Sequence, residues 1–143
     1  TIGDCYMASC GVPSPRPDHA AAIADFALDV RALCEGRSFR GHRLALRIGV
    51  HSGPVIAGVI GQHRQLYDLW GETVNTASRM ESHGEPGEVQ VSAATASLLA
   101  DTHAIRERGS IEVKGIGAMT TAFIVGRREE RPAGDAPPAA GRR

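Results

Sequence analysis

The alternating polarity of residues 44–50 places the tightest constraint on the fold. Leucine, isoleucine and valine occupy every second position of this segment, and alanine, arginine and glycine stand between them. Successive side chains of a strand point to opposite faces of its sheet, so a period of two is typical of a strand with one apolar face. We therefore expect residues 44–50 to form a strand that packs against a core.

Two other segments have the spacing of helices. Asp18 is a good N-cap for a helix from about His19 to Glu35, and Gly36 is a natural stop. The apolar side chains that recur at helical spacing in this segment are Ile23, Phe26, Val30 and Leu33. A second main helix is expected from about Thr73 to Ser82.

Short apolar runs between glycine, proline and charged residues are typical of further strands. The expected strands are residues 5–10, a buried strand within 52–61, and residues 66–70, 89–91, 111–114 and 121–125. An Ala-rich short helix should follow the strand at 89–91. Strands interleaved with two main helices predict an α/β sandwich with the helices on one face of the sheet. We expect residues 1–126 to form one domain and 127–143, rich in Pro, Ala, Gly and Arg, to be a disordered tail.

Composition argues against several classes of function. The 143 residues fit one domain. The 16 basic residues balance 16 acidic ones and only 4% of residues are aromatic, which argues against an RNA-binding sheet. No apolar run approaches the roughly 20 residues of a transmembrane helix. The three cysteines match no zinc spacing, so reduced thiols in a cytoplasmic compartment are the simplest interpretation.

Five polar residues stand where an amphipathic pattern would not require them. Asp4 could bind a hard cation such as Mg²⁺, or be an ordinary turn residue. Asn75 and Arg79 are four residues apart on one helix face, which suits a phosphate or an oxyanion but also a plain helix surface. Arg47 and Lys114 could contact phosphate or be solvated charges. Taken one by one, these residues favour the structural interpretation over the functional one.

Four sequence strings in a fixed order indicate one family. They are Thr1-Ile-Gly-Asp-Cys-Tyr-Met, Leu46-Arg-Ile-Gly-Val-His-Ser-Gly53, Tyr67-Asp-Leu-Trp-Gly-Glu-Thr-Val-Asn-Thr-Ala-Ser-Arg-Met-Glu81 and Val113-Lys-Gly115. Together they resemble the catalytic domain of class III adenylyl and guanylyl cyclases, over residues 1 to about 127. The resemblance implies a ferredoxin-like, palm-type α+β sandwich with helices on a mostly antiparallel sheet. The intervening sequence is similar to mycobacterial adenylyl cyclases whose catalytic domain follows a membrane anchor.

The resemblance implies that each active site is shared across a head-to-tail homodimer. On one side, Asp4 matches the second of two aspartates that hold two Mg²⁺ or Mn²⁺ ions, and Arg47 matches a ligand of the triphosphate. The family's first metal aspartate and a second purine-reading residue would stand upstream of Thr1. We therefore expect a fragment that lacks the domain's N-terminal strand and helices, and that is inactive alone.

The opposite subunit would supply the remaining groups. Asp68 matches the residue that reads the purine, and Asn75 and Arg79 match the pair that orients the ribose and stabilises the transition state. Lys114 matches a lysine that holds the terminal phosphates. A carboxylate accepts from the adenine 6-amino group and opposes the guanine 6-oxo group, so Asp68 implies an adenylate cyclase that makes 3′,5′-cyclic AMP and pyrophosphate. The alternatives are a guanylate cyclase and a silent nucleotide-binding or dimerisation module.

Overall fold

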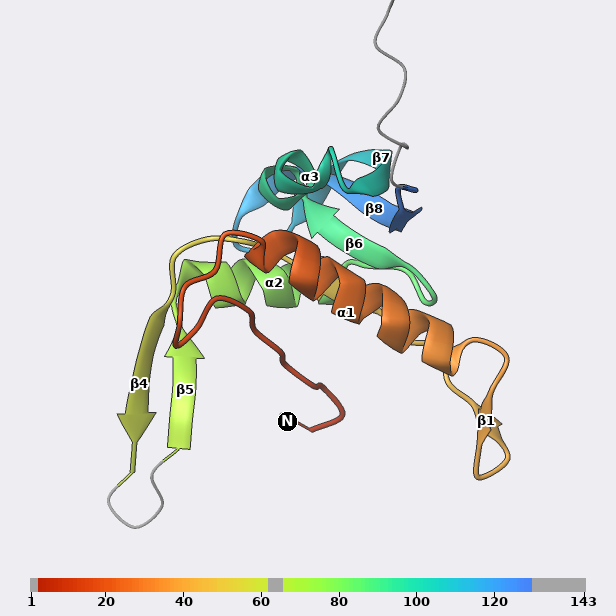
Figure 1. The fold of residues 1–143 in the computed structure, drawn as a ribbon, viewed down its shortest axis with the longest axis horizontal. Helices are drawn as coiled ribbons and strands as arrows, with labels where there is room; N and C mark the ends of the chain where they lie inside the picture. The colour runs from red at the N-terminus through yellow and green to blue at the C-terminus, as the bar shows by residue number, and fades with distance from the viewer. Residues whose placement is uncertain (1–2, 62–65, 130–143) are drawn as a thin grey trace, which may run out of the picture.

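The centre of the fold is a four-stranded sheet with the strand order β3–β6–β8–β7. In this computed structural model, which describes residues 3–61 and 66–129, the strands are β3 (Ile48–Val50), β6 (Val89–Ser92), β8 (Gly117–Arg127) and β7 (His103–Val113) (Figure 1). The helices are α1 (His19–Cys34), α2 (Glu72–Ser82) and α3 (Ala93–Leu99). The β3–β6 pair is parallel and the other two pairs are antiparallel. A mostly antiparallel sheet with packed helices confirms the expected fold class.

Helices cover both faces of this sheet. Val89 and Val91 of β6 belong to a buried apolar cluster with residues of α1 and with Leu99 of α3. Gln90 lies between these valines and points to the other face, where its Nε2 donates to the Met80 carbonyl of α2 at 3.0 Å. α2 therefore packs opposite α1 and α3, and the expectation that the helices share one face is wrong for α2.

α1 faces the sheet with small apolar side chains. Its buried residues are Ala20, Ala24, Ala27 and Leu28. Phe26 and Leu33 remain 44% and 48% exposed, and Ile23 packs at the margin of the core. The apolar face expected for this helix is therefore wrong at Phe26 and Leu33. Three alanines let the helix lie close to the strands, and Leu28 is the one large side chain of α1 that is buried in the contact.

β3 packs directly against the backbone of α2 at Gly49. A Cβ atom on Gly49 would lie 2.0 Å from the Glu81 nitrogen and 2.7 Å from the Ala77 carbonyl oxygen. Such distances are shorter than any van der Waals contact, so a side chain fits here only if the helix moves. Gly49 also pairs in register with Gln90, which contacts α2 from the neighbouring strand. Glycine at this position therefore sets how close α2 lies to the sheet.

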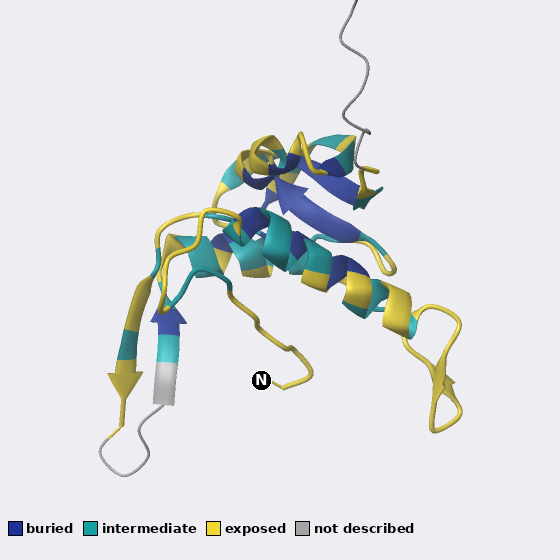
Figure 2. Cartoon of the chain, viewed as in Figure 1, coloured by how far each residue is buried: buried dark blue, intermediate teal, exposed yellow. Residues whose placement is uncertain are grey.

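Two short antiparallel ribbons extend from this core. They are formed by β4 (Ile56–Ile60) with β5 (Leu66–Trp70), and by β1 (Ser38–Phe39) with β2 (His42–Arg43). Figure 2 shows mostly exposed residues along β4, where Ile56 is 69% and Val59 is 61% exposed. The strand expected within residues 52–61 exists, but the expectation that it is buried is wrong. Among the described residues β4 pairs only with β5, and no second layer covers its apolar side chains.

Two expected strands are absent or shortened. Residues 5–10 form no strand beyond an isolated bridge at Cys5, so that expectation is wrong. Of residues 44–50, only the last three join the sheet, because β6 begins at Val89, the partner of Ile48. A strand forms only where a neighbouring segment supplies backbone partners, and an alternating pattern does not report where that neighbour begins.

The remaining elements are confirmed with shifted ends. Both main helices lie where the spacing predicts them, and Gly36, with φ of 70°, follows the first. Asp18 precedes α1 but does not cap it, because its carboxylate accepts from Arg16 at 2.6 Å. The closing pair of strands is longer than expected, with 11 residues in each strand. Residues 130–143 of the expected tail lie outside the described residues.

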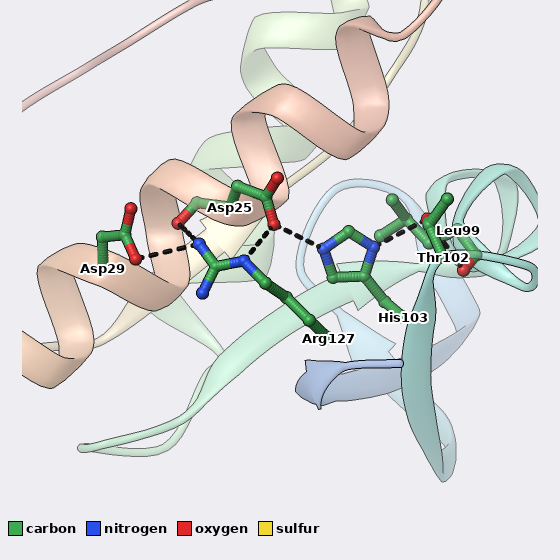
Figure 3. A network of polar contacts seen from close by, with 6 residues as sticks. All are labelled: Asp25, Asp29, Leu99, Thr102, His103 and Arg127. Atoms are coloured by element: carbon green, nitrogen blue, oxygen red, sulfur yellow. Dashed lines mark hydrogen bonds and ion pairs between the residues drawn. The ribbon is translucent and has the colours of Figure 1, made fainter. Parts of the chain in front are cut away.

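A polar network ties α1 to β7 and β8 (Figure 3). His103 is 2% exposed, and its Nε2 lies 3.0 Å from Oδ1 of Asp25 on α1. A carboxylate only accepts, so the imidazole donates in this contact. Arg127 donates to the same Asp25 oxygen at 2.7 Å and to Asp29 Oδ1 at 2.8 Å. The network holds the middle of α1 against the first residue of β7 and the last residue of β8.

Within the described ranges, no helix is long and apolar enough to span a membrane.

Replacing Gly49 by alanine should destabilise the protein and displace α2. Overpacking a filled site typically costs about 1–3 kcal/mol in the free energy of unfolding, and a clash with backbone atoms favours the upper end of that range. The measurement is urea unfolding of Gly49→Ala. Gly126→Ala is the matched control, since a Cβ there meets nothing within 4 Å. Equal stability of Gly49→Ala and wild type would contradict the close contact.

Removing the Asp25 carboxylate should destabilise the protein more than removing Asp29. Asp25→Ala leaves the buried His103 without its acceptor, which typically costs about 1–3 kcal/mol. Asp29→Ala is the matched control on the same helix, because the Asp29 side chain is 70% exposed and, among the described residues, pairs only with the half-exposed Arg127. Thermal unfolding of the two variants gives the comparison. Equal losses would show that the His103 contact contributes nothing beyond a surface ion pair.

Candidate active site

Three of the six candidate residues lie on one continuous segment of β5 and α2. Asp68 stands on β5, and Asn75 and Arg79 stand on α2. Gly71 joins the two elements with φ of 118°, a conformation that favours glycine. The chain changes direction at Gly71, where β5 ends and α2 begins. The relative positions of Asp68, Asn75 and Arg79 therefore depend on this one turn.

The carboxylate of Asp68 is oriented by the main chain. Asp68 is half-buried, and the Leu69 N–H donates to its Oδ1 at 2.9 Å. In the β4–β5 ribbon Asp68 stands opposite Gly58, which has no side chain to cover it. Trp70 lies two residues further along β5 and therefore on the same face as Asp68. Asp68 thus presents an oriented hydrogen-bond acceptor on the same ribbon face as an aromatic ring.

α2 presents its two candidate residues away from its buried side. Thr76 and Met80 are the buried residues of the helix. Asn75 is exposed and Arg79 is half-buried, and the two are one turn apart. An amide and a guanidinium at this spacing can donate hydrogen bonds to the same anionic group. Arg79 also stands in the last turn of the helix, where the helix dipole favours a cation.

Arg47 lies beside α2 and forms an ion pair with a residue of that helix. Its Nη2 and Nε both lie 3.0 Å from Oε1 of Glu81. The guanidinium is 47% exposed, so the ion pair lies at the surface. Glu81 is not one of the six candidate residues, although it closes the sequence string that contains Asn75 and Arg79. A triphosphate bound by Arg47 would have to share the guanidinium with Glu81 or displace Glu81.

Asp4 and Lys114 lie on turns away from this segment. Asp4 is exposed in the turn after Gly3, and Lys114 is exposed directly after β7. Gly115 follows Lys114 with φ of 83°, which closes the turn between β7 and β8. The described contacts do not bring either residue against Asp68, Asn75 or Arg79. Within one chain, the structure therefore does not gather the six candidate residues into a single site.

A shallow hollow beside α1 and α2 is lined by other residues. It is bounded by the segment 7–12, by α1, by residues 51–55 and by the side of α2 that carries Val74 and Ala77. Its lining includes none of the six candidates. His51 Nδ1 lies 2.6 Å from Ser92 Oγ, and partial burial lowers the pKa of His51. We assign this hollow no role in the chemistry.

The described residues do not form a complete metal site. Asp4 is the candidate ligand, and in the described part of the chain no group of three or more His, Cys, Asp or Glu residues could hold an ion. Mg²⁺ gives up its water reluctantly and is not held by one exposed carboxylate. No step of the chemistry is therefore derived through a metal ion bound to this chain alone.

Comparison with known proteins identifies the family. Residues 1–126 match the family model described as the adenylate and guanylate cyclase catalytic domain. An adenylate cyclase of Mycobacterium tuberculosis is 49% identical over 127 residues, which cover 88% of this chain and 29% of that protein. The human guanylate cyclase soluble subunit beta-2 is 48% identical over 128 residues, covering 87% of this chain and 21% of that protein. The chain thus spans less than a third of the length of these curated relatives.

Solved structures give the same assignment. The guanylate cyclase domain of RhGC from Catenaria anguillulae, in complex with GTP, superposes with a TM-score of 0.80 at 38% identity, covering 83% of this chain and 66% of that chain. The adenylyl cyclase CyaB from P. aeruginosa superposes with a TM-score of 0.72 at 28% identity, covering 85% of this chain and 67% of that chain. Class III cyclase domains act on nucleotides, use divalent metal ions and commonly dimerise. The sequence of this chain and its fold indicate the same family. The chain belongs to the class III adenylate and guanylate cyclase catalytic domain family.

Proposed function

We propose that the full-length protein is an adenylate cyclase that converts ATP to 3′,5′-cyclic AMP and pyrophosphate. The observation that carries this proposal is the carboxylate of Asp68, which is half-buried and oriented by the Leu69 N–H. A carboxylate accepts from the adenine 6-amino group, whereas the guanine 6-oxo group would face it lone pair to lone pair. An unpaired or opposed polar group at a half-buried site typically costs about 1–3 kcal/mol, which is enough to decide between the two purines.

Asn75 and Arg79 carry the proposed chemistry. The ribose 3′-oxygen attacks the α-phosphorus, the bond from that phosphorus to the leaving pyrophosphate breaks, and the 3′-hydroxyl proton passes to water. Asn75 would orient the ribose, and Arg79 would donate to the oxygens on which charge develops in the transition state. Both side chains stand on the accessible side of α2, whose buried side is fixed against the sheet. Such fixed donors stabilise charge without reorganising during the reaction.

Two copies of the chain would complete each site. Asp68, Asn75 and Arg79 would serve one site, and Asp4 and Arg47 would serve the other. This division is supported by the separation of the candidates within one chain and by the exposed apolar side chains of β4, which a second copy could cover. Lys114 would reach the terminal phosphates from the turn after β7.

Divalent ions would neutralise charge on the phosphates once the site is complete. We propose two Mg²⁺ or Mn²⁺ ions for each site, with Asp4 as the ligand that this chain supplies. The exposure of Asp4 on a turn supports this role, because a cation could reach its carboxylate there. Membrane attachment of the full-length protein stays a proposal based on the similarity to mycobacterial cyclases.

Guanylate cyclase activity is the second candidate function. It is favoured by identity to the human guanylate cyclase subunit, at 48%, which nearly equals the 49% identity to the mycobacterial adenylate cyclase. Overall identity therefore does not separate the two substrates, and the choice depends on Asp68. A silent nucleotide-binding module is the third, and the presence of Asp68, Asn75 and Arg79 together argues against it.

Replacing Asp68 by cysteine should reduce the preference for ATP. The ratio of kcat/KM for ATP to that for GTP should fall roughly 5- to 150-fold, which corresponds to about 1–3 kcal/mol. Cyclic AMP and cyclic GMP are measured by chromatography with the full-length protein. Asp101→Cys is the matched control, because Asp101 is an exposed aspartate in the turn after α3. A wild-type protein that makes cyclic GMP faster than cyclic AMP at equal substrate would refute the assignment.

Two inactive variants should restore activity when mixed. In a heterodimer of Asp4→Ala and Arg79→Ala, one of the two sites has both intact residues. Random exchange makes about half of the dimers mixed, so about a quarter of wild-type activity should return. The control is Asp4→Ala mixed with the double variant Asp4→Ala/Arg79→Ala, which has no intact site. Mixtures that stay inactive despite demonstrated subunit exchange would contradict the shared site.

A further inference from the structure

The C-terminal end of α2 is held by side chains from the sheet. The last carbonyls of a helix have no partner within the helix. The Met80 carbonyl accepts from Gln90 Nε2 at 3.0 Å, and the His83 carbonyl accepts from Arg108 Nη1 at 2.6 Å. Gln90 lies on β6 and Arg108 on β7, so two strands contact the end of one helix. We call Gln90 and Arg108 the end clamp.

The two residues of the end clamp also fix each other. Gln90 is fully buried, and its amide oxygen accepts from the same Nη1 of Arg108. Because the amide donates to Met80 and accepts from Arg108, it cannot rotate without losing both hydrogen bonds. Arg108 also pairs with Glu85 at 3.4 Å and lies 5.3 Å over the Phe123 ring. The clamp thus joins a buried amide to a partly buried guanidinium in one arrangement that satisfies both.

The end clamp holds α2 at the residue next to Arg79. Met80 directly follows Arg79, and a helix advances about 1.5 Å per residue. Gly49 fixes the distance between α2 and the sheet, but that contact does not stop the helix from sliding along its axis or rotating about it. A hydrogen bond to the Met80 carbonyl restrains both motions within the turn that carries Arg79. Displacement of a reacting or stabilising group by about 1 Å can cost about 10²-fold in rate.

We propose that Gln90 and Arg108 are positioning residues that set the place of the Arg79 guanidinium in the transition state. This inference rests on the proposed function, in which Arg79 stabilises developing charge. Neither residue of the clamp touches substrate. Since Arg79 acts in the transition state, loosening the clamp lowers kcat and leaves KM for ATP nearly unchanged.

The chain offers a matched pair of arginines for the test. Arg106 and Arg108 both lie over the Phe123 ring, at 4.7 and 5.3 Å from its centre. Each pairs with a glutamate, Arg106 with Glu88 at 3.1 Å. Of the two, only Arg108 contacts the end of α2 in the described structure. Arg108→Met and Arg106→Met therefore each remove a cation from the Phe123 ring and an ion pair with a glutamate, but only Arg108→Met also removes a hydrogen bond to the end of α2.

The experiment measures kcat and KM for ATP on the full-length protein. Arg108→Met should lower kcat roughly 10- to 100-fold with KM changed less than about threefold, and Arg106→Met should leave both near wild type. Gln90→Met, which keeps the volume and removes both hydrogen bonds, should reproduce the effect of Arg108→Met. If one of these variants does not fold, the other gives the test. Equal kcat values for Arg108→Met and Arg106→Met would overturn the inference.

A double-mutant cycle separates this inference from the proposed function. In an Arg79→Ala background, Arg108→Met should lower kcat no further, because the residue it positions is gone. If Arg79→Ala lowers kcat and Arg108→Met lowers it by the same factor in both backgrounds, the clamp acts elsewhere and the inference is wrong. If Arg79→Ala leaves kcat unchanged, the proposed role of Arg79 fails and the inference fails with it.

Discussion

The contact between Gly49 and the backbone of α2 is the constraint on which the candidate site depends. A Cβ on Gly49 would lie 2.0 Å from the Glu81 nitrogen, so the helix rests on the strand with nothing between them. Gln90, the register partner of Gly49, donates to the Met80 carbonyl from the next strand. These two neighbouring positions fix both the height and the axial position of the helix, and the side that faces away from the sheet carries the donors proposed for catalysis.

Local patterns predicted most of the elements, because helical spacing and strand alternation depend on the residues themselves. They failed where structure depends on distant partners. Residues 5–10 have the composition of a strand but form only an isolated bridge at Cys5. Leu44 stands beyond the start of β6 and is 47% exposed. On α1 the large apolar residues Phe26 and Leu33 suggested the buried face, yet three alanines and Leu28 form it. Size alone does not decide burial where a helix must lie close to a sheet.

Pattern singled out five of the six candidate residues without favouring a functional role for any of them, and the resemblance added Asp68 and assigned the roles. Asp68, Asn75 and Arg79 are joined by one strand and one helix, so their sequence order reflects their arrangement. Asp4 lies on a turn more than 60 residues earlier in the sequence, and no local pattern relates it to the others. The contacts of Glu81 and of the end clamp escaped the sequence analysis for a similar reason, since they join residues of different elements. Glu81 pairs with Arg47 and lies two residues after Arg79 on α2. In the proposed dimer, Arg47 and Arg79 of one chain would serve two different sites, so this ion pair would connect the two sites.

We expect α2 of one subunit to complete the nucleotide site of a second copy of the chain. A crystal structure of the full-length dimer with a slowly reacting ATP analogue and Mg²⁺ would show which subunit each contact comes from. The adenine should contact Asp68 and the α-phosphate should contact Arg79 of one subunit, while the triphosphate should reach Arg47 of the other. A nucleotide that contacts Asp68, Arg79 and Arg47 of the same subunit would contradict this expectation.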